Sequence, residues 1–344
     1  MKENEVKCGK TDNFINEIMN IRNITIIGGG TIGTALGNTL AKKQENEILI
    51  LSIEKDVIDS INETRYNAKY FPGIRLSRYL RATGDESVLA NSDAIFLAIP
   101  SNVTVEYVMK VKDFLNPDAI LLNLAKGFSR DQKTISESLE AKLINPVCSF
   151  KGPTFARELI NNLPTAFTLG SKDNSHFALF KRVFDDTPVH IDFTTDVRGV
   201  EYLSILKNIY AIATGIVDAH FNSPNLRFLF LTKAFNEMKD ILMHYGGKDD
   251  TMFKYCGYGD FSLTALNDLS RNRTLGLLIG KGFFTNDISD KVVLEGKNAV
   301  AVFCEEISKS NQTSCNYSII GEIYKVFNED YDISKFVNRV INNS

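Results

Sequence analysis

The strongest constraint on the fold is a glycine-rich segment between an apolar run and a helical pattern. Residues 24–27 are Ile-Thr-Ile-Ile, and Gly28, Gly30 and Gly33 follow with the spacing Gly-x-Gly-x-x-Gly. In this fingerprint the first glycine allows a tight turn, the second lets the backbone approach a pyrophosphate, and the third lets the helix pack on the strand. The free N–H groups and the positive dipole end at the helix start also favour phosphate. The segment therefore predicts dinucleotide binding.

Short β-rich runs alternate with helical patterns up to about residue 198, and helical spacing dominates from Val200 onward. Such alternation predicts a parallel sheet covered by helices. We expect an α/β fold with an N-terminal extension (1–22), a Rossmann-type doubly wound parallel sheet (23–198) and a mostly α-helical substrate domain (199–344). The expected strands are Ile24–Ile27, Glu47–Leu51, Ala94–Ile99, Ala119–Leu124, Pro146–Phe150 and Ala166–Leu169.

Composition narrows the class of partner. The chain has 344 residues and a net charge of −3, which argues against nucleic acid or an anionic membrane as the main partner. Its five cysteines are scattered without a Cys-x-x-Cys pair, and its four histidines lack metal-ligand spacing. No run approaches the roughly 20 apolar residues of a membrane span. We expect a cytoplasmic protein with reduced thiols, no metal and no membrane insertion.

The second strand ends close to a carboxylate. Glu54 follows Gly33 by about the 20 residues expected of a side chain that accepts from a ribose 2′-hydroxyl. A carboxylate there would repel a 2′-phosphate, so NAD is favoured. The neighbouring Lys55 leaves NADP as an alternative, and a solvated Glu54 without a cofactor role is the plainer interpretation.

Ligands of open α/β sheets bind outside the carboxyl ends of the strands. Three expected strands end at Pro100, at Lys126 and at the segment 152–156. A lysine at a strand rim can reach a cofactor or substrate, although it can equally be a surface lysine in a turn. In the segment 152–156, backbone N–H groups and the Thr154 hydroxyl could meet an anion.

Lys207 lies among apolar residues in a predicted helix. Lysine is almost never fully buried without a partner, and desolvation lowers its pKa toward the range in which it exchanges protons with an alcohol or carbonyl oxygen. The alternative is a side chain that keeps its amine in water. Asp260 could orient such an amine, or could be an ordinary turn residue.

A third charged feature opens a helix near residue 270. Ser270 is the expected N-cap, which places Arg271 and Asn272 in the first turn. A cation is unfavourable there for the helix dipole unless an anion docks beside it, and a phosphate would satisfy the guanidinium, the amide and the free N–H groups together. Simple capping with solvated arginines is the alternative.

Together these segments resemble the bacterial-type NAD(P)-dependent sn-glycerol-3-phosphate dehydrogenase family over about residues 23–325. The resemblance implies reversible hydride transfer between NAD(P)H and dihydroxyacetone phosphate, which gives sn-glycerol 3-phosphate, in a homodimer. The motifs that carry it are Ile61–Asn67, Tyr70–Gly73, Lys126–Gly127, Gly152–Ala156, Leu206–Asn208, Gly257–Asp260, Ser270–Asn272 and Val293–Gly296.

The resemblance also implies roles for individual residues. Lys207 looks like the proton donor and acceptor, within a catalytic set that includes Lys126 and Asp260. The expected substrate-binding residues are Lys126, Gly152, Thr154, Lys207, Asp260, Ser270, Arg271 and Asn272. With the fingerprint and strand ends included, the expected cofactor-binding residues are Gly28, Gly30, Thr31, Ile32, Gly33, Glu54, Pro100, Lys126, Ala156, Arg271, Val293 and Glu295.

Three positions depart from the family pattern. Ile32 stands where the family usually has an aromatic residue, and Ile53 stands where it usually has an arginine, which strengthens the NAD prediction. Residues 221–225 replace a glycine-rich loop, so this lid is expected to be stiffer or differently shaped. Two alternatives follow: a dehydrogenase of another phosphorylated polyol or β-hydroxyacid, and a non-catalytic NAD-sensing protein. A sensor has no need of the proton-transfer lysine.

Overall fold

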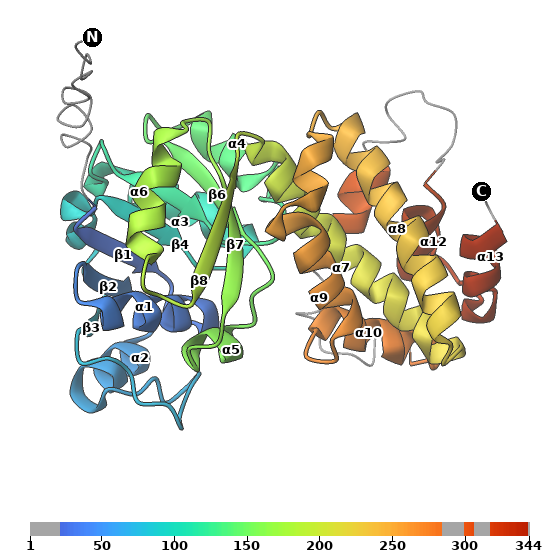
Figure 1. Cartoon of the computed structure of the whole chain (residues 1–344), viewed down its shortest axis with the longest axis horizontal. Helices are drawn as coiled ribbons and strands as arrows, with labels where there is room; N and C mark the ends of the chain where they lie inside the picture. Colours follow the sequence, from blue (N-terminus) through green and yellow to red (C-terminus); the bar gives the residue numbers. More distant parts are fainter. Residues whose placement is uncertain (1–20, 284–298, 306–316, 343–344) are drawn as a thin grey trace, which may run out of the picture.

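The computed structural model describes residues 21–283, 299–305 and 317–342. An eight-stranded sheet with helices on its faces is followed by a helical part beside it (Figure 1). The strand order is β3-β2-β1-β4-β5-β6-β7-β8, and every neighbouring pair is parallel except β6 and β7. The strands are β1 (Asn23–Ile27), β2 (Glu47–Leu51), β3 (Leu80–Thr83), β4 (Ala94–Leu97), β5 (Ile120–Asn123), β6 (Val147–Lys151), β7 (Thr165–Gly170) and β8 (Val189–Thr194).

All six expected strands are present: β2 has the expected ends, and the ends of the others differ by at most two residues. Two strands were not predicted, and they are the two edges of the sheet, β3 and β8. Edge strands are less buried, so they lack the continuous apolar run that marks a central strand of a parallel sheet. The expectation of a wholly parallel sheet is wrong at one place, because β7 runs antiparallel to β6.

Alternate residues of the central strands enter two separate cores. Ile26 and Phe96 lie in one apolar cluster, whereas Ile27 and Leu97 lie in the other. Side chains point to opposite faces with a period of two, so the sheet is covered on both faces, as a doubly wound fold requires. The helices of this part are α1 (Thr31–Lys43), α2 (Lys55–Asp59), α3 (Ser101–Lys110), α4 (Ile135–Glu140), α5 (Ala156–Ile160) and α6 (Ser175–Phe184).

The helical part is organised around one long helix, α7 (Val197–His220), which begins beside the sheet and is buried along nearly its whole length (Figure 1). By length and hydropathy α7 could cross a membrane, contrary to the expectation that no run approaches this length. Its burial on all sides is typical of a core helix. Around it lie α8 (Pro224–His244), α9 (Asp260–Leu266), α10 (Arg271–Gly280), α12 (Ser318–Asn328) and α13 (Phe336–Asn342), with short turns at η5 (Asp249–Phe253) and η6 (Tyr255–Gly259).

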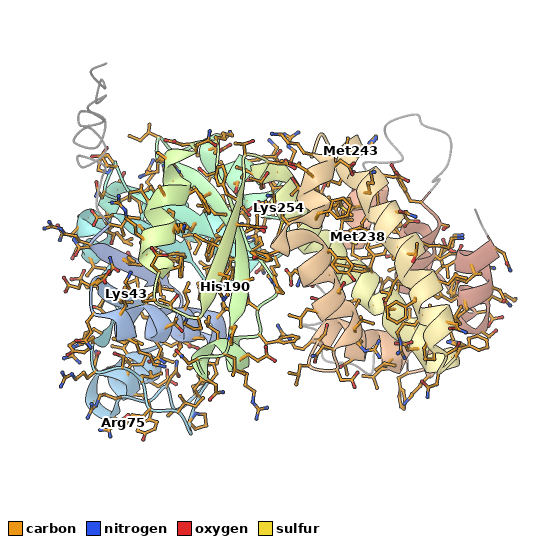
Figure 2. All side chains as sticks on the ribbon, in the orientation of Figure 1. Lys43, Arg75, His190, Met238, Met243 and Lys254 are labelled. Carbon is orange, nitrogen blue, oxygen red and sulfur yellow. The ribbon has the colours of Figure 1, made fainter. Side chains whose placement is uncertain are left out.

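Main-chain donors join the helical part to the sheet. The Tyr255 N–H donates to Asp192 of β8 (3.2 Å), and the Cys256 N–H donates to Thr168 of β7 (2.9 Å). Figure 2 labels Lys254 at this junction. Because Asp260 follows η6 directly, these bonds place the start of α9 against the sheet.

Candidate active site

The glycine fingerprint has the predicted local geometry. Gly28 has φ +117°, and a Cβ atom there would lie 2.6 Å from the Ala98 carbonyl oxygen, so no other residue fits. A Cβ atom on Gly33 would lie 2.0 Å from the Gly28 oxygen, which shows how closely α1 packs on the turn. Gly30 is the N-cap position of α1, and no side chain caps the helix there. A Cβ atom on Gly30 would have no other atom within 4 Å. The free N–H groups of α1, which begins at Thr31, therefore face open space suited to a phosphate.

An asparagine outside the fingerprint supports the glycine turn. The buried Asn67 side chain donates to the Gly29 carbonyl (2.9 Å) and to the Thr34 hydroxyl (2.9 Å), and Thr34 donates to the same carbonyl (3.0 Å). Asn67 is not among the residues predicted from the sequence to form the site. The only signal was its place in the motif at residues 61–67.

Glu54 is engaged rather than solvated. Its carboxylate forms an ion pair with Lys69 and accepts from the Tyr70 hydroxyl (3.1 Å). Burial raises the pKa of Tyr70, and the hydrogen bond to Glu54 adds to the rise. Lys55, considered for NADP, pairs with Asp59 instead (2.5 Å), and Ile53 is 86% exposed. The carboxylate is thus fixed at the carboxyl end of β2.

Two lysines meet one carboxylate at the carboxyl ends of β5 and β6. Asp260, 1% exposed at the start of α9, accepts from Lys207 Nζ through Oδ1 (2.6 Å) and from Lys126 Nζ through Oδ2 (2.8 Å). Lys207 also donates to the hydroxyl of Thr264 (2.8 Å), which lies one helical turn after Asp260 in α9. Lys126 also donates to the Gly152 carbonyl (3.1 Å). The structure therefore brings together the three residues predicted as the catalytic set.

The electrostatics of this centre suit proton transfer. Burial lowers the pKa of Lys207 to about 7, while the Asp260 charge opposes the fall and the Lys126 charge adds to it. The Lys207 amine is buried, so the interpretation of this residue as a lysine reaching into water is wrong. Lys126 is partly exposed and is the more accessible of the two ammonium groups.

The segment after β6 is shaped by close packing. A Cβ atom on Gly152 would lie 2.2 Å from the Ala166 carbonyl oxygen, so this position takes only glycine. The Thr154 hydroxyl donates to that same carbonyl (3.2 Å), so in this arrangement its proton is not available to an anion. Ala156 begins α5, and Pro100 precedes α3.

The start of α10 is as predicted at Ser270 but differs at the second arginine. The Ser270 hydroxyl accepts from the Arg273 N–H (3.3 Å), and Arg271 is exposed in the first turn, with Asn272 partly exposed beside it. Within the described part of the chain no ion pair involves Arg271, so its guanidinium faces solvent. Arg273 is buried instead, paired with Asp218 of α7. The alternative of solvated arginines is therefore wrong for Arg273.

Two further buried charges were not predicted from the sequence. Lys151 at the end of β6 and Glu201 near the start of α7 lie 3.8 Å apart, both almost completely buried. Two predicted cofactor residues, Val293 and Glu295, lie outside the described residues.

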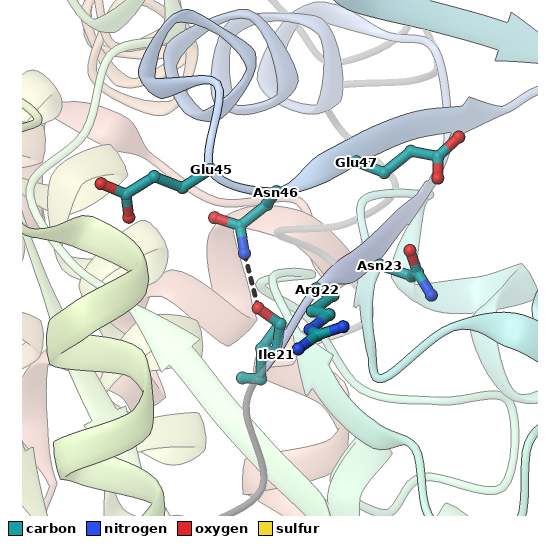
Figure 3. A pocket seen from close by; sticks show the side chains of 6 residues that line it. All are labelled: Ile21, Arg22, Asn23, Glu45, Asn46 and Glu47. Carbon is teal, nitrogen blue, oxygen red and sulfur yellow. Dashed lines mark hydrogen bonds between the residues drawn. The ribbon is translucent and has the colours of Figure 1, made fainter.

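A pocket of about 500 Å³ lies elsewhere, at the amino ends of β1 and β2 (Figure 3). It is open and lined by Ile21, Arg22, Asn23, Glu45, Asn46 and Glu47. The amino ends are the opposite side of a parallel sheet from the edge where ligands bind. The pocket therefore has no part in the candidate site.

The fingerprint and the buried lysine–carboxylate centre are the parts of a nicotinamide-dependent oxidoreductase. The sequence model of the NAD-dependent glycerol-3-phosphate dehydrogenase N-terminus matches residues 23–177, and that of the C-terminus matches residues 196–338. The chain belongs to the family of NAD(P)-dependent glycerol-3-phosphate dehydrogenases.

Individual relatives agree over nearly the whole length. The glycerol-3-phosphate dehydrogenase [NAD(P)+] of Clostridium acetobutylicum is 34% identical over 319 residues, 91% of this chain and 95% of that protein. Chloroplastic glycerol-3-phosphate dehydrogenase [NAD(+)] 2 of Arabidopsis thaliana is 31% identical over 93% of this chain and 78% of its own. The crystal structure of the Coxiella burnetii glycerol-3-phosphate dehydrogenase superposes with a TM-score of 0.83 at 26% identity, covering 93% of this chain and 99% of that one.

Proposed function

We propose that the chain catalyses reversible hydride transfer between NAD(P)H and dihydroxyacetone phosphate, forming sn-glycerol 3-phosphate. The observation that carries this proposal is the Lys207–Asp260–Lys126 centre, which lies at the same edge of the sheet as the glycine fingerprint. Bound at the fingerprint, the nicotinamide cofactor supplies the hydride. The residues of the chain bind, orient and protonate the substrate.

Lys207 is the proton donor in the reducing direction and the proton acceptor in the oxidising direction. A group whose pKa lies near the working pH serves in both roles, because both protonation states are populated. Asp260 and Thr264 hold its amine in one place (2.6 and 2.8 Å). Lys126 contributes positive charge close to the position where the substrate oxygen becomes negative.

The substrate phosphate is assigned to the start of α10. Arg271 offers an exposed guanidinium that forms no ion pair within the described residues, Asn272 an amide, and the first turn its free N–H groups. Close packing of α10 on α7 supports this placement. A Cβ atom on Gly276 of α10 would lie 2.0 Å from the Ile212 carbonyl oxygen and 3.0 Å from the Cα of Gly215, so α10 lies directly against the helix that carries Lys207.

NAD is the preferred cofactor in this proposal. Tyr70 and Lys69 fix the Glu54 carboxylate where a ribose 2′-hydroxyl would donate to it, and a 2′-phosphate would be repelled. Ile53 offers no positive charge to such a phosphate. Lys69, which is half-exposed, is a nearby cation that could turn from Glu54 toward a 2′-phosphate, so some use of NADP is compatible with the site.

Residues 221–225 link α7 to α8, which begins at Pro224. Ser223 caps α8 by accepting from the Leu226 N–H (3.3 Å), and Pro224 takes the first helical position, where it is favoured.

A dehydrogenase of another phosphorylated polyol or β-hydroxyacid would use the same centre, so the substrate's identity rests on the family. A sensor without turnover is disfavoured by the buried, pKa-shifted Lys207.

The homodimer stays a prediction from the resemblance, and the cytoplasmic location stays a prediction from the composition. Exposed aromatic side chains on the helical part are compatible with a second copy of the chain: Phe228, Phe253 and Tyr258.

The test is the loss of NADH absorbance with dihydroxyacetone phosphate, beside unphosphorylated dihydroxyacetone and beside NADPH. The proposal predicts oxidation that requires the phosphorylated ketone and is faster with NADH. Binding of NADH without oxidation would refute the substrate assignment and favour the sensor.

A further inference from the structure

The strongest unexplained feature is a lysine in the middle of the protein. Lys151 is fully buried at the end of β6, although lysine is almost never buried in this way without a specific partner. Burying its charge is costly, so an apolar residue would be the simpler choice for packing alone. Neither the proposed proton transfer nor the phosphate site uses it.

The contacts of Lys151 lead to the other lysine of the site. Its Nζ donates to the main-chain carbonyls of Asn123 (2.8 Å) and Ala125 (2.5 Å), which flank the end of β5. Ala125 immediately precedes Lys126. In return, Lys126 reaches back to the carbonyl of Gly152 (3.1 Å), the residue after Lys151. Each lysine thus binds the main chain beside the other, and the two strand ends are tied together twice.

A carboxylate from α7 completes the arrangement. Glu201 lies 3.8 Å from Lys151 Nζ, and it accepts from the Asn123 amide and from both the hydroxyl (3.0 Å) and the N–H (3.2 Å) of Ser136. The Asn123 side chain in turn accepts from the Ala125 N–H (2.9 Å). Both the N–H and the C=O of Ala125 are therefore held, so the peptide that leads into Lys126 has little freedom.

These bonds do not depend on the charge of the amine. Burial lowers the pKa of Lys151 to about 7, and the Lys126 charge lowers it further, against the raising effect of Glu201. A neutral amine keeps two N–H donors, one for each carbonyl. The tie to β5 therefore persists in both protonation states.

We infer that Lys151 is a positioning residue, which acts on the reaction by fixing the main chain of Lys126 and hence the cation that stabilises the substrate oxygen. This role rests on the proposed function. A displacement of about 1 Å at a reacting group can cost on the order of a hundredfold in rate. Loss of the Lys151 bonds is therefore expected to lower kcat without removing any group that contacts substrate or cofactor.

A double-mutant cycle on kcat separates this role from a purely structural one. The four proteins are the wild type, Lys151→Met, Lys126→Met and the double variant, with NADH affinity and thermal unfolding measured on each. Lys151→Met should lower kcat by about tenfold to a hundredfold, with NADH affinity nearly unchanged. In the Lys126→Met background the same change should cost little more, because the group that Lys151 positions is already absent.

Lys43→Met is the matched control. Lys43 is also a largely buried lysine that donates to a main-chain carbonyl, that of Arg182 (2.5 Å), but it lies at the end of α1, away from the site. Its effect on kcat should be the same in both backgrounds. If Lys151→Met does not fold, Lys151→Gln replaces it in the cycle with the same criteria, because its amide is polar but its side chain is one bond shorter, which moves the donor away from both carbonyls.

An unchanged kcat in a folded Lys151 variant would overturn the inference, and so would losses that multiply fully in the double variant. A wild-type protein that binds NADH but does not reduce dihydroxyacetone phosphate would instead refute the proposed function, and the role of Lys151 with it.

Discussion

Replacement of Lys207 by alanine tests the proton-transfer step most sharply. General acid–base catalysis contributes about 10²–10⁴-fold to rate, which is about 2.7–5.5 kcal/mol of barrier. Asp260 keeps its bond from Lys126 at 2.8 Å in this variant, so it does not become an unpaired buried charge. The loss of stability should therefore be smaller than the 3–5 kcal/mol that follows when a buried charge loses its only partner.

The assay is NADH oxidation with dihydroxyacetone phosphate at saturating concentrations, and NADH fluorescence reports cofactor binding separately. We expect kcat to fall by at least about 10²-fold while NADH binding is retained. A small primary amine, such as ethylamine, should restore part of the rate, because the substitution vacates the buried position of the Lys207 amine. Lys239→Met removes a half-exposed lysine that pairs with Asp249 (3.0 Å) and should leave kcat unchanged. Near-normal rates in a folded Lys207→Ala protein would refute the assignment.

Three further predictions concern pH, cofactor and substrate phosphate. The pKa of Lys207 is about 7, so kcat/KM for ketone reduction should fall as pH rises above about 7, whereas kcat/KM for alcohol oxidation should rise through the same range. Measuring kcat/KM against pH in both directions checks this, and profiles that run parallel would contradict it. Ile53→Arg places a guanidinium at an exposed position, where it could pair with the 2′-phosphate of NADPH. The ratio of kcat/KM with NADPH to kcat/KM with NADH should therefore rise by roughly tenfold or more, the equivalent of one charge-assisted hydrogen bond. An unchanged ratio would place the ribose contact elsewhere. Asp218→Asn weakens the ion pair with buried Arg273, which lies two residues after Arg271. Chemical denaturation should therefore show a free energy of unfolding lower by about 1–3 kcal/mol, and KM for the phosphorylated ketone should rise. An unaltered KM would separate this ion pair from phosphate binding.

Features that depend on local sterics could be predicted from the sequence. The turn at Gly28 needs a positive φ, and Gly33 needs the absence of a side chain, so both requirements are written in residue type. Lys207 was recognisable because a charge interrupted an apolar helical pattern. The central strands were recognisable because they are buried on both faces.

Features that depend on distant partners could not be predicted in this way. Lys126 and Asp260 are 134 residues apart, and Arg273 and Asp218 are 55 apart, so nothing in the local pattern distinguishes a solvated arginine from a paired one. Lys151 stands at the end of a strand, where a lysine is ordinarily a surface residue. Its burial arises from α7, which closes over the ends of β5 and β6 and brings Glu201 with it.

The edges of the sheet illustrate the same limit. β3 and β8 carry polar residues because one side of each strand has no neighbour, and β7 is antiparallel because of how its connection to β6 runs in space. Neither property leaves a periodic signal in the sequence.

The most direct test of the central claim follows the hydride itself. The protein is incubated with dihydroxyacetone phosphate and NADH that carries deuterium at both C4 positions, and the product is analysed by mass spectrometry. Our account predicts sn-glycerol 3-phosphate with one deuterium at C2, formed by the wild type and strongly reduced in Lys207→Ala. An unlabelled product, or no product from a protein that binds NADH, would contradict it.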